Sequence, residues 1–423
     1  MKLSQLHFSG RDSRNIIFVL FAVLVLTVGL LLFYGYFSGY FAPQLTKIYY
    51  ADNISPAHQI VIDRFNEMYA DEIEIVPIDL PFIKFNTNLR NELLARSLRN
   101  QNNLIDVFAI DQVWNSRFSI WAEPLETLFP DSTLTSILPN VLANAYTGSH
   151  LSSMPMHTDV GVMYYRRDMV QKIDPSGKLE QKLKRSISWN GFIQLGMAHG
   201  SPNNFYAFQG SNYEGLTVNF MEIMGPSYAN NLFNLETLEL NSKLVEKGRS
   251  FLYNLIHIQK VAPTEVTEFN EDQTTAFALN NDTPFFRGWP SLYRTLQDSS
   301  LDHLFGIAAL PHSEGEPAAS VLGGWNLMIS RHSNVKPEAA LFLNYMISEP
   351  VQEIMLKEGG YLPVISSLYS KQSILSEVQY LSYLKHLVDN GFYRPSVTQY
   401  IQLSQILAET LHAALSSPPQ ISE

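Results

Sequence analysis

Strands and helices alternate along residues 47–129, and this alternation limits the fold more than any other feature. The predicted strands "KIYYAD", "EIEIVPI" and "LIDVFAID" are each followed by a segment with helical spacing of its apolar residues. The first helix is predicted to begin at Pro56, with Ser55 as its N-cap. A β-α-β-α-β order is typical of a parallel sheet with helices on both faces. The sequence therefore predicts an α/β protein.

The rest of the chain keeps strands but loses the regular alternation. Further strands are predicted at "FFRGW", "FGIAALP" and "LGGWNLMIS", and an amphipathic helix is predicted over residues 336–346. The chain has 423 residues, of which 46% are apolar. This composition is sufficient to form a hydrophobic core. The chain is longer than a single core usually accommodates, so we expect two domains.

A long apolar segment precedes the α/β region. Residues 15–37 carry no charge, and Lys2, Arg11 and Arg14 lie before them. A run of about 20 apolar residues suits a membrane-spanning helix, while a secretory signal usually has only about 7–15. The charge distribution places residues 1–14 in the cytoplasm and exports the remainder. We predict an uncleaved signal anchor over residues 15–37; the alternative is a long cleavable signal, and both export the body of the protein.

Composition and motifs exclude several classes of function. The chain has no cysteine, so disulfides, thiolate metal sites, a cysteine nucleophile and amino-terminal lipidation are excluded. Its formal charge of −11 argues against a nucleic-acid partner. No phosphate-binding loop, dinucleotide fingerprint, zinc-protease motif or serine-hydrolase elbow is present. The eleven histidines form no pair at useful helical spacing, so neither a metal nor a cofactor is expected.

Polar and aromatic residues recur where predicted strands end. Asp111 ends "FAID", Asp159 follows "MHT", and Trp289 follows "FRG". In "LGGWNL" two glycines precede Trp325, and Arg394 precedes a proline in "GFYRPSV". Ligands bind at this edge of open α/β sheets. Carboxylates accept hydrogen bonds from hydroxyl groups, and indoles cover the apolar face of a sugar ring, so the pattern favours a sugar site. Paired carboxylates would also suit a glycosidase, which remains an alternative.

These segments resemble the extracellular solute-binding proteins of ABC importers, in the maltose/trehalose-binding branch. The resemblance covers nearly the whole exported chain, in family order. The segments that carry it are "IDRFNEMY", "IDVFAIDQVWNSRFSIWAEPL", "MPMHTDVGVMYYRRDMV", "FQGSNYEGLTVNFMEIM", "FFRGWP", "FGIAALP", "LGGWNLMIS", "GGYLPVISSLY" and "RPSVTQY".

The resemblance implies a two-lobed periplasmic-binding-protein fold of type II with a sugar bound between the lobes. The first lobe is expected to comprise residues 45–156 and 306–360, and the second residues 157–305 and 361–423. The implied ligand-binding residues are two hydroxyl-binding carboxylates, two stacking tryptophans, two glycines that admit the ligand and one arginine: Asp111, Asp159, Trp289, Trp325, Gly323, Gly324 and Arg394.

Two segments depart from the family pattern. The family often has an acidic ligand residue at the start of the first helix, where "ADNISPAHQ" offers only Asp52 and His58, neither in clear register. The sequence leaves open whether either contacts the ligand. The family's tyrosine before the Asp159 segment is also missing from "GSHLSSMP". The identity of the sugar is therefore not predicted beyond a disaccharide or oligosaccharide similar to trehalose or maltose.

The sequence as a whole predicts a non-enzymatic, membrane-anchored binding subunit on the periplasmic or extracellular side. It would deliver sugar to a permease and, through it, to ATPase subunits. Two alternatives remain open: a sugar-sensing module for a membrane receptor, which has the same site but a different partner, and a glycoside hydrolase, which would turn over a disaccharide.

Overall fold

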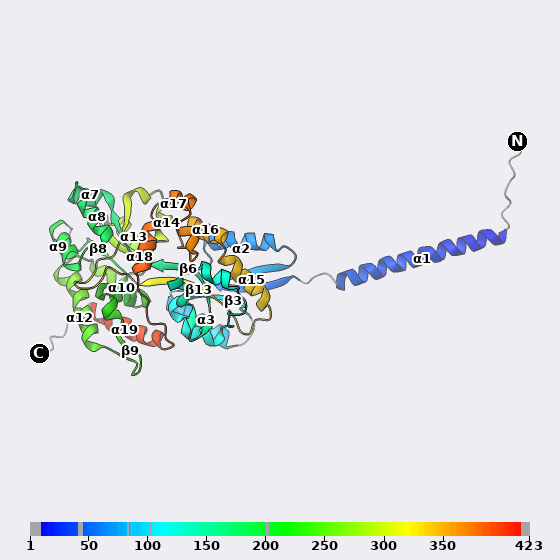
Figure 1. The fold of residues 1–423 in the computed structure, drawn as a ribbon, viewed down its shortest axis with the longest axis horizontal. Helices are drawn as coiled ribbons and strands as arrows, with labels where there is room; N and C mark the ends of the chain where they lie inside the picture. Colours follow the sequence, from blue (N-terminus) through cyan, green and yellow to red (C-terminus); the bar gives the residue numbers. More distant parts are fainter. Residues whose placement is uncertain are drawn as a thin grey trace.

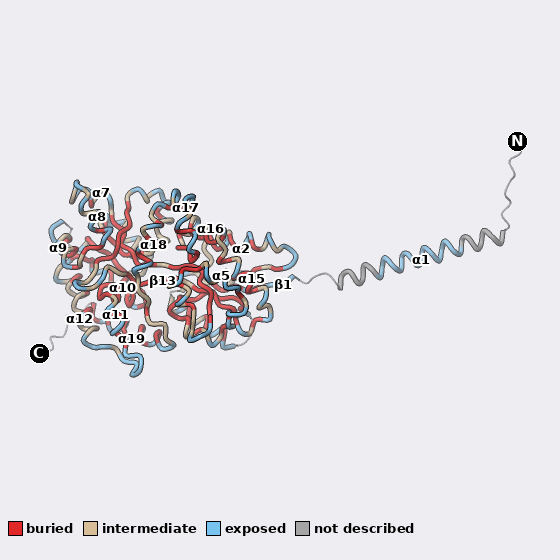
Figure 2. Tube along the Cα trace, in the orientation of Figure 1, coloured by how far each residue is buried: buried red, intermediate tan, exposed pale blue. Residues whose placement is uncertain are grey.

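The computed structural model describes residues 10–40, 45–82, 84–85, 87–100, 104–199 and 203–415. Two α/β lobes, each with its own β-sheet, lie beside each other, and one long helix extends away from them (Figure 1). Buried residues form the interior of both lobes (Figure 2). The predicted α/β architecture with two lobes is therefore confirmed.

The first lobe contains a five-stranded sheet in the order β2-β1-β3-β13-β6. Its strands are β1 (Thr46–Asp52), β2 (Ile73–Asp79), β3 (Val107–Asp111), β6 (Met154–Val160) and β13 (Leu322–Ile329). β1 is parallel to β2 and β3, as the alternation predicts. β13 runs antiparallel to both β3 and β6. The sheet is therefore mixed, because its last two strands come from outside the alternating region.

The helices that connect the first strands lie where the sequence predicts them. α2 (Pro56–Met68) follows β1, and α3 (Thr87–Arg99) follows β2. The Ser55 side chain accepts a hydrogen bond from the His58 N–H, and Pro56 is the first helical residue, so the predicted cap is confirmed. α15 (Lys336–Met346) has the predicted bounds, and it packs with α16 (Glu349–Gly359) against α2.

One predicted helix is wrong. Residues 112–129 do not form one helix but three short turns: η1 (Gln112–Trp114), α4 (Asn115–Phe118) and η2 (Ser119–Trp121). Beyond them, Ala122 forms an isolated β-bridge with Ser330, and the Glu123 N–H donates to the Ile329 carbonyl. Hydrogen bonding to the end of β13 therefore replaces the helical bonds that the local pattern favoured.

The second lobe contains a four-stranded sheet in the order β12-β7-β11-β8. Its strands are β7 (Val162–Arg166), β8 (Tyr206–Ala207), β11 (Phe285–Gly288) and β12 (Phe305–Ala308). β7 is antiparallel to β11 and β12, and β8 is parallel to β11. The elements between β7 and β12 are α7 (Arg167–Ile173), α8 (Lys178–Arg185), α9 (Trp189–His199), α10 (Glu214–Met224), α11 (Pro226–Ala229), β9 (Phe233–Asn234), β10 (Glu239–Leu240), α12 (Ser242–Tyr253), η3 (Asn254–Ile258), η4 (Thr264–Glu268), α13 (Glu271–Asn280), α14 (Leu292–Asp298) and η5 (Asp302–Leu304).

The remaining elements complete the two lobes. Before β6 these are α5 (Asp131–Ser136), α6 (Pro139–Ala143), β4 (Tyr146–Thr147) and β5 (His150–Leu151). After α16 they are η6 (Ser366–Tyr369), α17 (Gln372–Glu377), α18 (Leu381–Asn390) and α19 (Tyr400–Leu415). α18 packs beside β6, whereas α19 packs on α10 and α12. The carboxyl-terminal region therefore contacts both lobes.

The first crossing of the chain from one sheet to the other occurs at a glycine. β6 ends at Val160 and β7 begins at Val162, so only Gly161 separates them. A Cβ at Gly161 would collide with the carboxylate of Glu222, which is why a larger residue does not fit. The sheets also place residues 306–308 in the second lobe, not in the first as the sequence suggested. We therefore propose that the first lobe ends at Gly161 and resumes between β12 and β13.

The helix outside the lobes is α1 (Gly10–Tyr40). Its side chains are described over residues 18–33, and all of these are exposed. Figure 1 shows α1 extending away from both lobes. Among the residues whose side chains are described, which within α1 are residues 18–33, no helix is long and apolar enough to cross a membrane, and the predicted anchor over residues 15–37 lies partly outside them.

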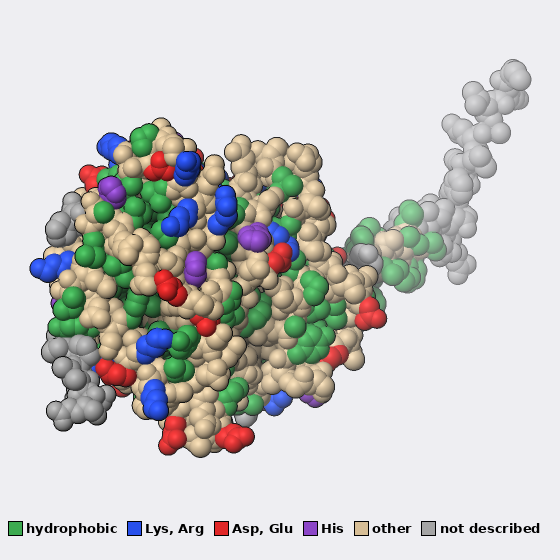
Figure 3. All heavy atoms as spheres, turned by 60° about the vertical axis from the view of Figure 1, so that its left-hand side comes forward, with side chains coloured by type: hydrophobic (Ala, Val, Ile, Leu, Met, Phe, Trp, Pro, Cys, Tyr) green, Lys and Arg blue, Asp and Glu red, His purple; other side chains and the backbone are tan. Residues whose placement is uncertain are grey.

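The face shown in Figure 3 carries acidic and basic side chains interspersed over both lobes. No patch of one charge dominates this face.

Candidate functional site

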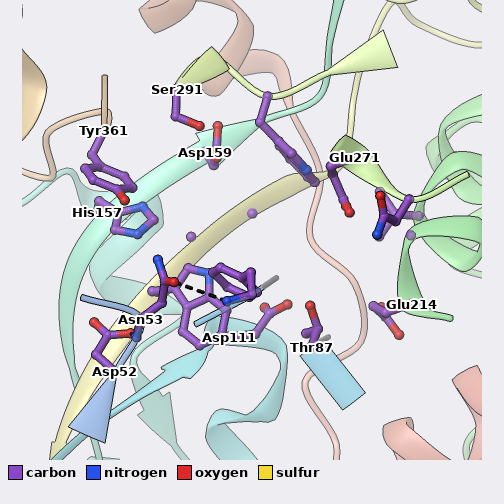
Figure 4. Close-up of a pocket in the computed structure, with 18 of the residues that line it drawn as sticks. Asp52, Asn53, Thr87, Asp111, His157, Asp159, Glu214, Glu271, Ser291 and Tyr361 are labelled. Carbon is purple, nitrogen blue, oxygen red and sulfur yellow. Dashed lines mark hydrogen bonds between the residues drawn. The ribbon is translucent and has the colours of Figure 1, made fainter. Parts of the chain in front are cut away.

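A cavity of about 330 Å³ lies between the two lobes. Figure 4 shows polar and aromatic side chains that surround it from several elements. The first lobe contributes residues at the ends of β1, β3, β6 and β13, and the second contributes residues next to β11 and at the starts of α10 and α13. The following side chains and glycines line it: Asp52, Asn53, His58, Phe82, Thr87, Asp111, Met156, His157, Asp159, Tyr213, Glu214, Gly215, Val218, Asn270, Glu271, Asp272, Trp289, Ser291, Gly323, Gly324, Trp325, Tyr361 and Arg394.

The register of the five-stranded sheet brings four of the predicted site residues together. Trp325 pairs with Asp111 across β13 and β3, and Gly323 pairs with Asp159 across β13 and β6. β3 and β6 end where the antiparallel β13 begins. Because these ends meet at one edge of the sheet, residues more than 160 positions apart in sequence line the same cavity.

Trp325 is held from behind by an arginine. The guanidinium of Arg90 lies 4.3 Å from the centroid of the Trp325 ring and equally far from the Phe82 ring. Arg90 is fully buried and donates a 2.9 Å hydrogen bond to Asp52. This cation–π packing fixes the indole, while Trp325 itself remains partly exposed and lines the cavity. The indole is thus oriented without being buried in a core.

Trp289 is held in the same way from the second lobe. The Arg287 guanidinium lies 3.8 Å from the Trp289 ring centroid, and it donates to both carboxylate oxygens of Glu222, at 3.1 and 3.0 Å. Arg287 and Glu222 are both buried, so neither charge reaches the solvent. Each tryptophan of the cavity therefore rests on an arginine that a carboxylate neutralises.

The two glycines before Trp325 have neighbours other than the expected ligand. A Cβ at Gly323 would lie 3.2 Å from the Trp289 ring, so this glycine lets the second lobe approach the first. Gly324 has φ +135°, and a Cβ there would lie 2.5 Å from the His157 carbonyl oxygen. Both glycines line the cavity, but the atoms that exclude a Cβ belong to the protein. Protein neighbours therefore account for both glycines, and their contact with a ligand stays a prediction.

Arg394 links both lobes. Its Nη2 donates to Asp111 at 2.7 Å and its Nη1 donates to Glu214 at 2.8 Å. Glu214 also accepts hydrogen bonds from the hydroxyl groups of Tyr400 and Ser404. Burial alone would lower the pKa of Arg394, but the two carboxylates raise its pKa overall. The guanidinium is therefore fixed as a cation between two carboxylates.

Two ionisable groups of β6 have strongly shifted pKa values. Burial raises the pKa of Asp159 to about 7, although the Val160 N–H and Arg287 oppose the shift. Burial also lowers the pKa of His157 to about 3, and the neighbouring His58 lowers it further. Burial lowers the pKa of His58 as well, against the attraction of Asp52. Both imidazoles are therefore uncharged at neutral pH.

The structure brings all seven residues of the predicted site to one cavity: Asp111, Asp159, Trp289, Gly323, Gly324, Trp325 and Arg394. Their contact with a ligand stays a prediction. Asp52 and His58, which the sequence left open, also line the cavity. Asp52 already accepts hydrogen bonds from Tyr50 and Arg90.

Several cavity residues were not predicted. His157 lies two residues before Asp159 on the same strand, so strand alternation could have identified it. Glu271 follows Asn270, the N-cap of α13, where a capping box is visible in the sequence. Glu214 and Tyr361 carry no comparable local signal. Within the described residues, no group of three or more His, Asp or Glu is placed to hold a metal ion.

A cavity between two α/β lobes, with tryptophans and carboxylates in its wall, defines the class: a two-lobed small-molecule-binding protein. The sequence comparison then gives the family. The profile of the bacterial extracellular solute-binding proteins matches residues 50–353, so the chain belongs to that family. The family resemblance noted in the sequence is confirmed.

Individual relatives agree with this assignment. A protein of Deinococcus radiodurans described as a probable ABC transporter-binding protein is 26% identical over 343 residues, which cover 78% of this chain and 80% of the relative. Maltose-bound MalE3 of T. maritima has a TM-score of 0.76 at 23% identity, covering 88% of this chain and 95% of that one. A solute-binding protein of Thermotoga lettingae bound with α-D-tagatose has a TM-score of 0.75 at 20% identity, covering 89% and 95%. These structures share the fold of this chain.

Proposed function

We propose that the protein is the substrate-binding subunit of an ABC sugar importer. It binds a disaccharide or short oligosaccharide, similar to maltose or trehalose, in the cavity between its lobes and delivers it to a permease driven by ATPase subunits. The single observation that carries this proposal is the meeting of Trp289, Trp325, Asp111 and Asp159 at one interlobe cavity. Aromatic faces and carboxylates are the groups that a sugar ring and its hydroxyl groups require.

The chemistry of the cavity supports a sugar in preference to a purely apolar ligand. Two indoles are held rigid by Arg90 and Arg287, so stacking costs little conformational entropy on binding. The cavity of about 330 Å³ is at the lower end of the range of roughly 300–1,000 Å³ for small-molecule sites, which favours a compact ligand. The roles of the seven predicted residues as ligand contacts belong to this proposal.

A neighbouring cavity of about 450 Å³ leaves room for a longer ligand. It shares six lining residues with the first cavity: Asn53, Glu271, Asp272, Trp289, Ser291 and Tyr361. A third sugar ring could enter it past the shared side chains. The proposal therefore includes short oligosaccharides as well as disaccharides.

We further propose that residues 15–37 anchor the chain in the cell membrane. This uncharged run and the absence of a cysteine for lipid attachment support the anchor. The binding lobes would then lie on the periplasmic or extracellular side. We also propose that the protein is not an enzyme and uses no cofactor, since its family consists of binding proteins. Hydrolysis of sugar, the alternative considered for Asp111 and Asp159, has no support among the relatives.

Calorimetric titration of the lobes with maltose, trehalose and their longer homologues tests the proposal. Micromolar affinity, which corresponds to about −8 kcal/mol, is expected for at least one of them. Absence of binding to every saccharide would overturn the proposal. Co-purification of the full chain with a permease, as opposed to a membrane receptor, distinguishes import from sensing.

A further inference from the structure

The described lining of the cavity has a large excess of acidic side chains. Six carboxylates line it, and Arg394 is the one Lys or Arg among its described lining residues. The acidic residues are Asp52, Asp111, Asp159, Glu214, Glu271 and Asp272. Both histidines of the lining have a lowered pKa and add no positive charge at neutral pH. The negative charge is therefore not balanced within the cavity wall.

Three of these carboxylates are already paired. Asp52 forms an ion pair with Arg90 at 2.9 Å, and Arg394 is paired with Asp111 and Glu214. The other three have no Lys or Arg nitrogen of the described residues within 4 Å: Asp159, Glu271 and Asp272. Arg287 lies behind Trp289, but its Nε and Nη2 donate to Glu222 and its Nη1 donates to Gln209 at 3.4 Å. The cavity wall thus offers three carboxyl groups that have no Lys or Arg nitrogen of the described residues within 4 Å.

Part of this excess has a structural explanation. Glu271 and Asp272 lie in the first turn of α13, where the helix dipole stabilises acidic side chains, and Tyr213 donates a 2.7 Å hydrogen bond to Glu271. Asp159 has no such explanation. It lies near the end of a strand, and among the described residues its side chain accepts one hydrogen bond, from the adjacent Val160 N–H. Asp159 is therefore the carboxylate that most requires a partner.

An uncharged polar side chain lies on the same strand. His157 is 7% exposed and lines the cavity, and its Nδ1 has no hydrogen-bond partner among the described residues. Its ring lies beside that of Tyr361, with the centroids 4.7 Å apart (Figure 4). An uncharged imidazole has one nitrogen that donates and one that accepts a hydrogen bond, and it does not repel a cation. The wall formed by β6 thus combines an unpaired carboxylate with an unpaired imidazole.

We infer that the ligand is a saccharide that carries a protonated amino group, and that its ammonium binds beside Asp159. The inference rests on the proposed function and specifies its substrate class. A hydroxyl group satisfies a carboxylate by one hydrogen bond, whereas an ammonium also neutralises it. In a partly buried cavity with three unpaired carboxylates, the charge is the larger requirement.

Matched sugars test the charge directly. Trehalose is compared with 2-amino-2-deoxytrehalose, and cellobiose with the glucosamine disaccharide, in calorimetric titrations at pH 7 and low salt. Spermidine serves as a cation that is not a sugar. We expect the amino sugar of at least one pair to bind 10-fold or more tightly than its neutral partner. The ratio should fall in 0.5 M salt, because salt screens the attraction.

Two substitutions and a control locate the effect. Asp159→Asn and Glu271→Gln keep the shape of each side chain and remove its charge, and each should reduce the amino-to-neutral affinity ratio several-fold. Glu236→Gln removes one charge from an exposed position outside the cavity and should leave the ratio unchanged. Because the ratio compares two sugars on the same folded protein, a variant that is merely less stable leaves it unaltered.

The outcomes separate the two proposals. Equal or tighter binding of the neutral sugars would overturn the inference and leave the sugar-binding function standing. Binding of spermidine with no saccharide bound would overturn the sugar-binding function while the preference for a cation stands. Failure of every probe would overturn both.

Discussion

Arg394 joins Asp111 of β3 to Glu214 of α10, with distances of 2.7 and 2.8 Å. β3 belongs to the first lobe, while α10 is tied to the second through the Glu222–Arg287 ion pair. Arg394 itself lies between α18 and α19, outside both sheets. One buried guanidinium thus links three segments of the chain at the wall of the cavity. A ligand in the cavity would bind next to a contact that already holds the lobes together.

Removal of this guanidinium should destabilise the protein strongly. Arg394→Gln leaves two buried carboxylates without their cation, and breaking a buried ion pair costs about 3–5 kcal/mol. We expect a lower free energy of unfolding in urea and weaker sugar binding. Arg331→Gln, at an exposed position, is the control and should change neither. An Arg394→Gln protein that unfolds at the wild-type urea midpoint would show that the link has no structural role.

Trp325 should matter more for binding than for folding. Because its ring is partly exposed and rests on Arg90, Trp325→Ala should cost only about 2 kcal/mol of stability, less than the roughly 3–5 kcal/mol of a core tryptophan. The loss of a stacking surface should weaken sugar binding about 30-fold, or about 2 kcal/mol. Calorimetry and urea unfolding measure the two effects.

Trp189→Ala is the matched control for that substitution. Trp189 is buried against Phe192, Tyr206 and Phe251 and does not line the cavity. Trp189→Ala should lower the free energy of unfolding by the roughly 3–5 kcal/mol of a core tryptophan and leave the sugar affinity of the folded fraction unchanged. If Trp325→Ala behaves as Trp189→Ala does, the sugar-binding site is misplaced.

The residues at the edge of the sheet could be predicted because strands and the polar residues that follow them are visible in short stretches of sequence. Asp111 ends β3 and Asp159 lies one residue before the end of β6, and both strands are antiparallel to β13, so they end at the same edge of the sheet. The pairing of Arg394 with Asp111 spans 283 residues, and no local spacing encodes a contact of that separation. Sequence analysis therefore singled out residues that line one cavity but not which of them neutralise each other.

The glycines of β13 show the same limit. Their position before Trp325 predicts a close approach of the backbone to a ligand, and it gives no sign of the protein neighbours that the structure shows. The neighbours turned out to be the Trp289 ring and the His157 carbonyl, which arrive from the other lobe and from β6. The wrong helix at residues 112–129 has a related origin, since β13 captures the backbone at Glu123. The hydrogen bonds to β13 therefore determine the backbone conformation near Glu123, and local helix propensity does not.

The membrane anchor predicts where the full chain is found. Residues 15–37 should retain it in the membrane fraction after alkaline carbonate extraction, because the run is uncharged and long enough to span a bilayer. Leu24→Lys with Val28→Lys should release it, since each lysine near the centre costs about 3 kcal/mol. Leu45→Lys, outside the run, is the control. A soluble wild-type protein whose mature amino terminus lies near Ala42 would contradict the anchor.

The pKa of Asp159 predicts an unusual pH dependence of stability. Its pKa is raised to about 7 in the folded protein from an ordinary value of 3.8. Between these values the folded state binds more protons than the unfolded state, so this carboxyl makes the protein less stable as pH rises from about 4 to 7. His157, with its pKa lowered to about 3, and His58 act in the opposite direction and destabilise the protein as pH falls below 6.5.

Asp159→Asn separates these effects, because both proteins keep the two histidines. The variant should have nearly the wild-type melting temperature at pH 4 and should exceed it progressively up to pH 8. Because the Asp159 side chain is partly exposed, solvent screens the charge, and we expect a gain of only about 1 kcal/mol, or about 2 °C, at pH 8. Asp298→Asn removes an exposed carboxylate of α14 and is the control. Its melting temperature should differ from that of the wild type by an amount that does not increase steadily from pH 4 to pH 8. Differential scanning calorimetry of the ligand-free proteins at pH 4, 6 and 8 measures the differences. An Asp159→Asn difference that stays constant from pH 4 to pH 8 would mean that Asp159 titrates as an ordinary carboxyl in the folded protein.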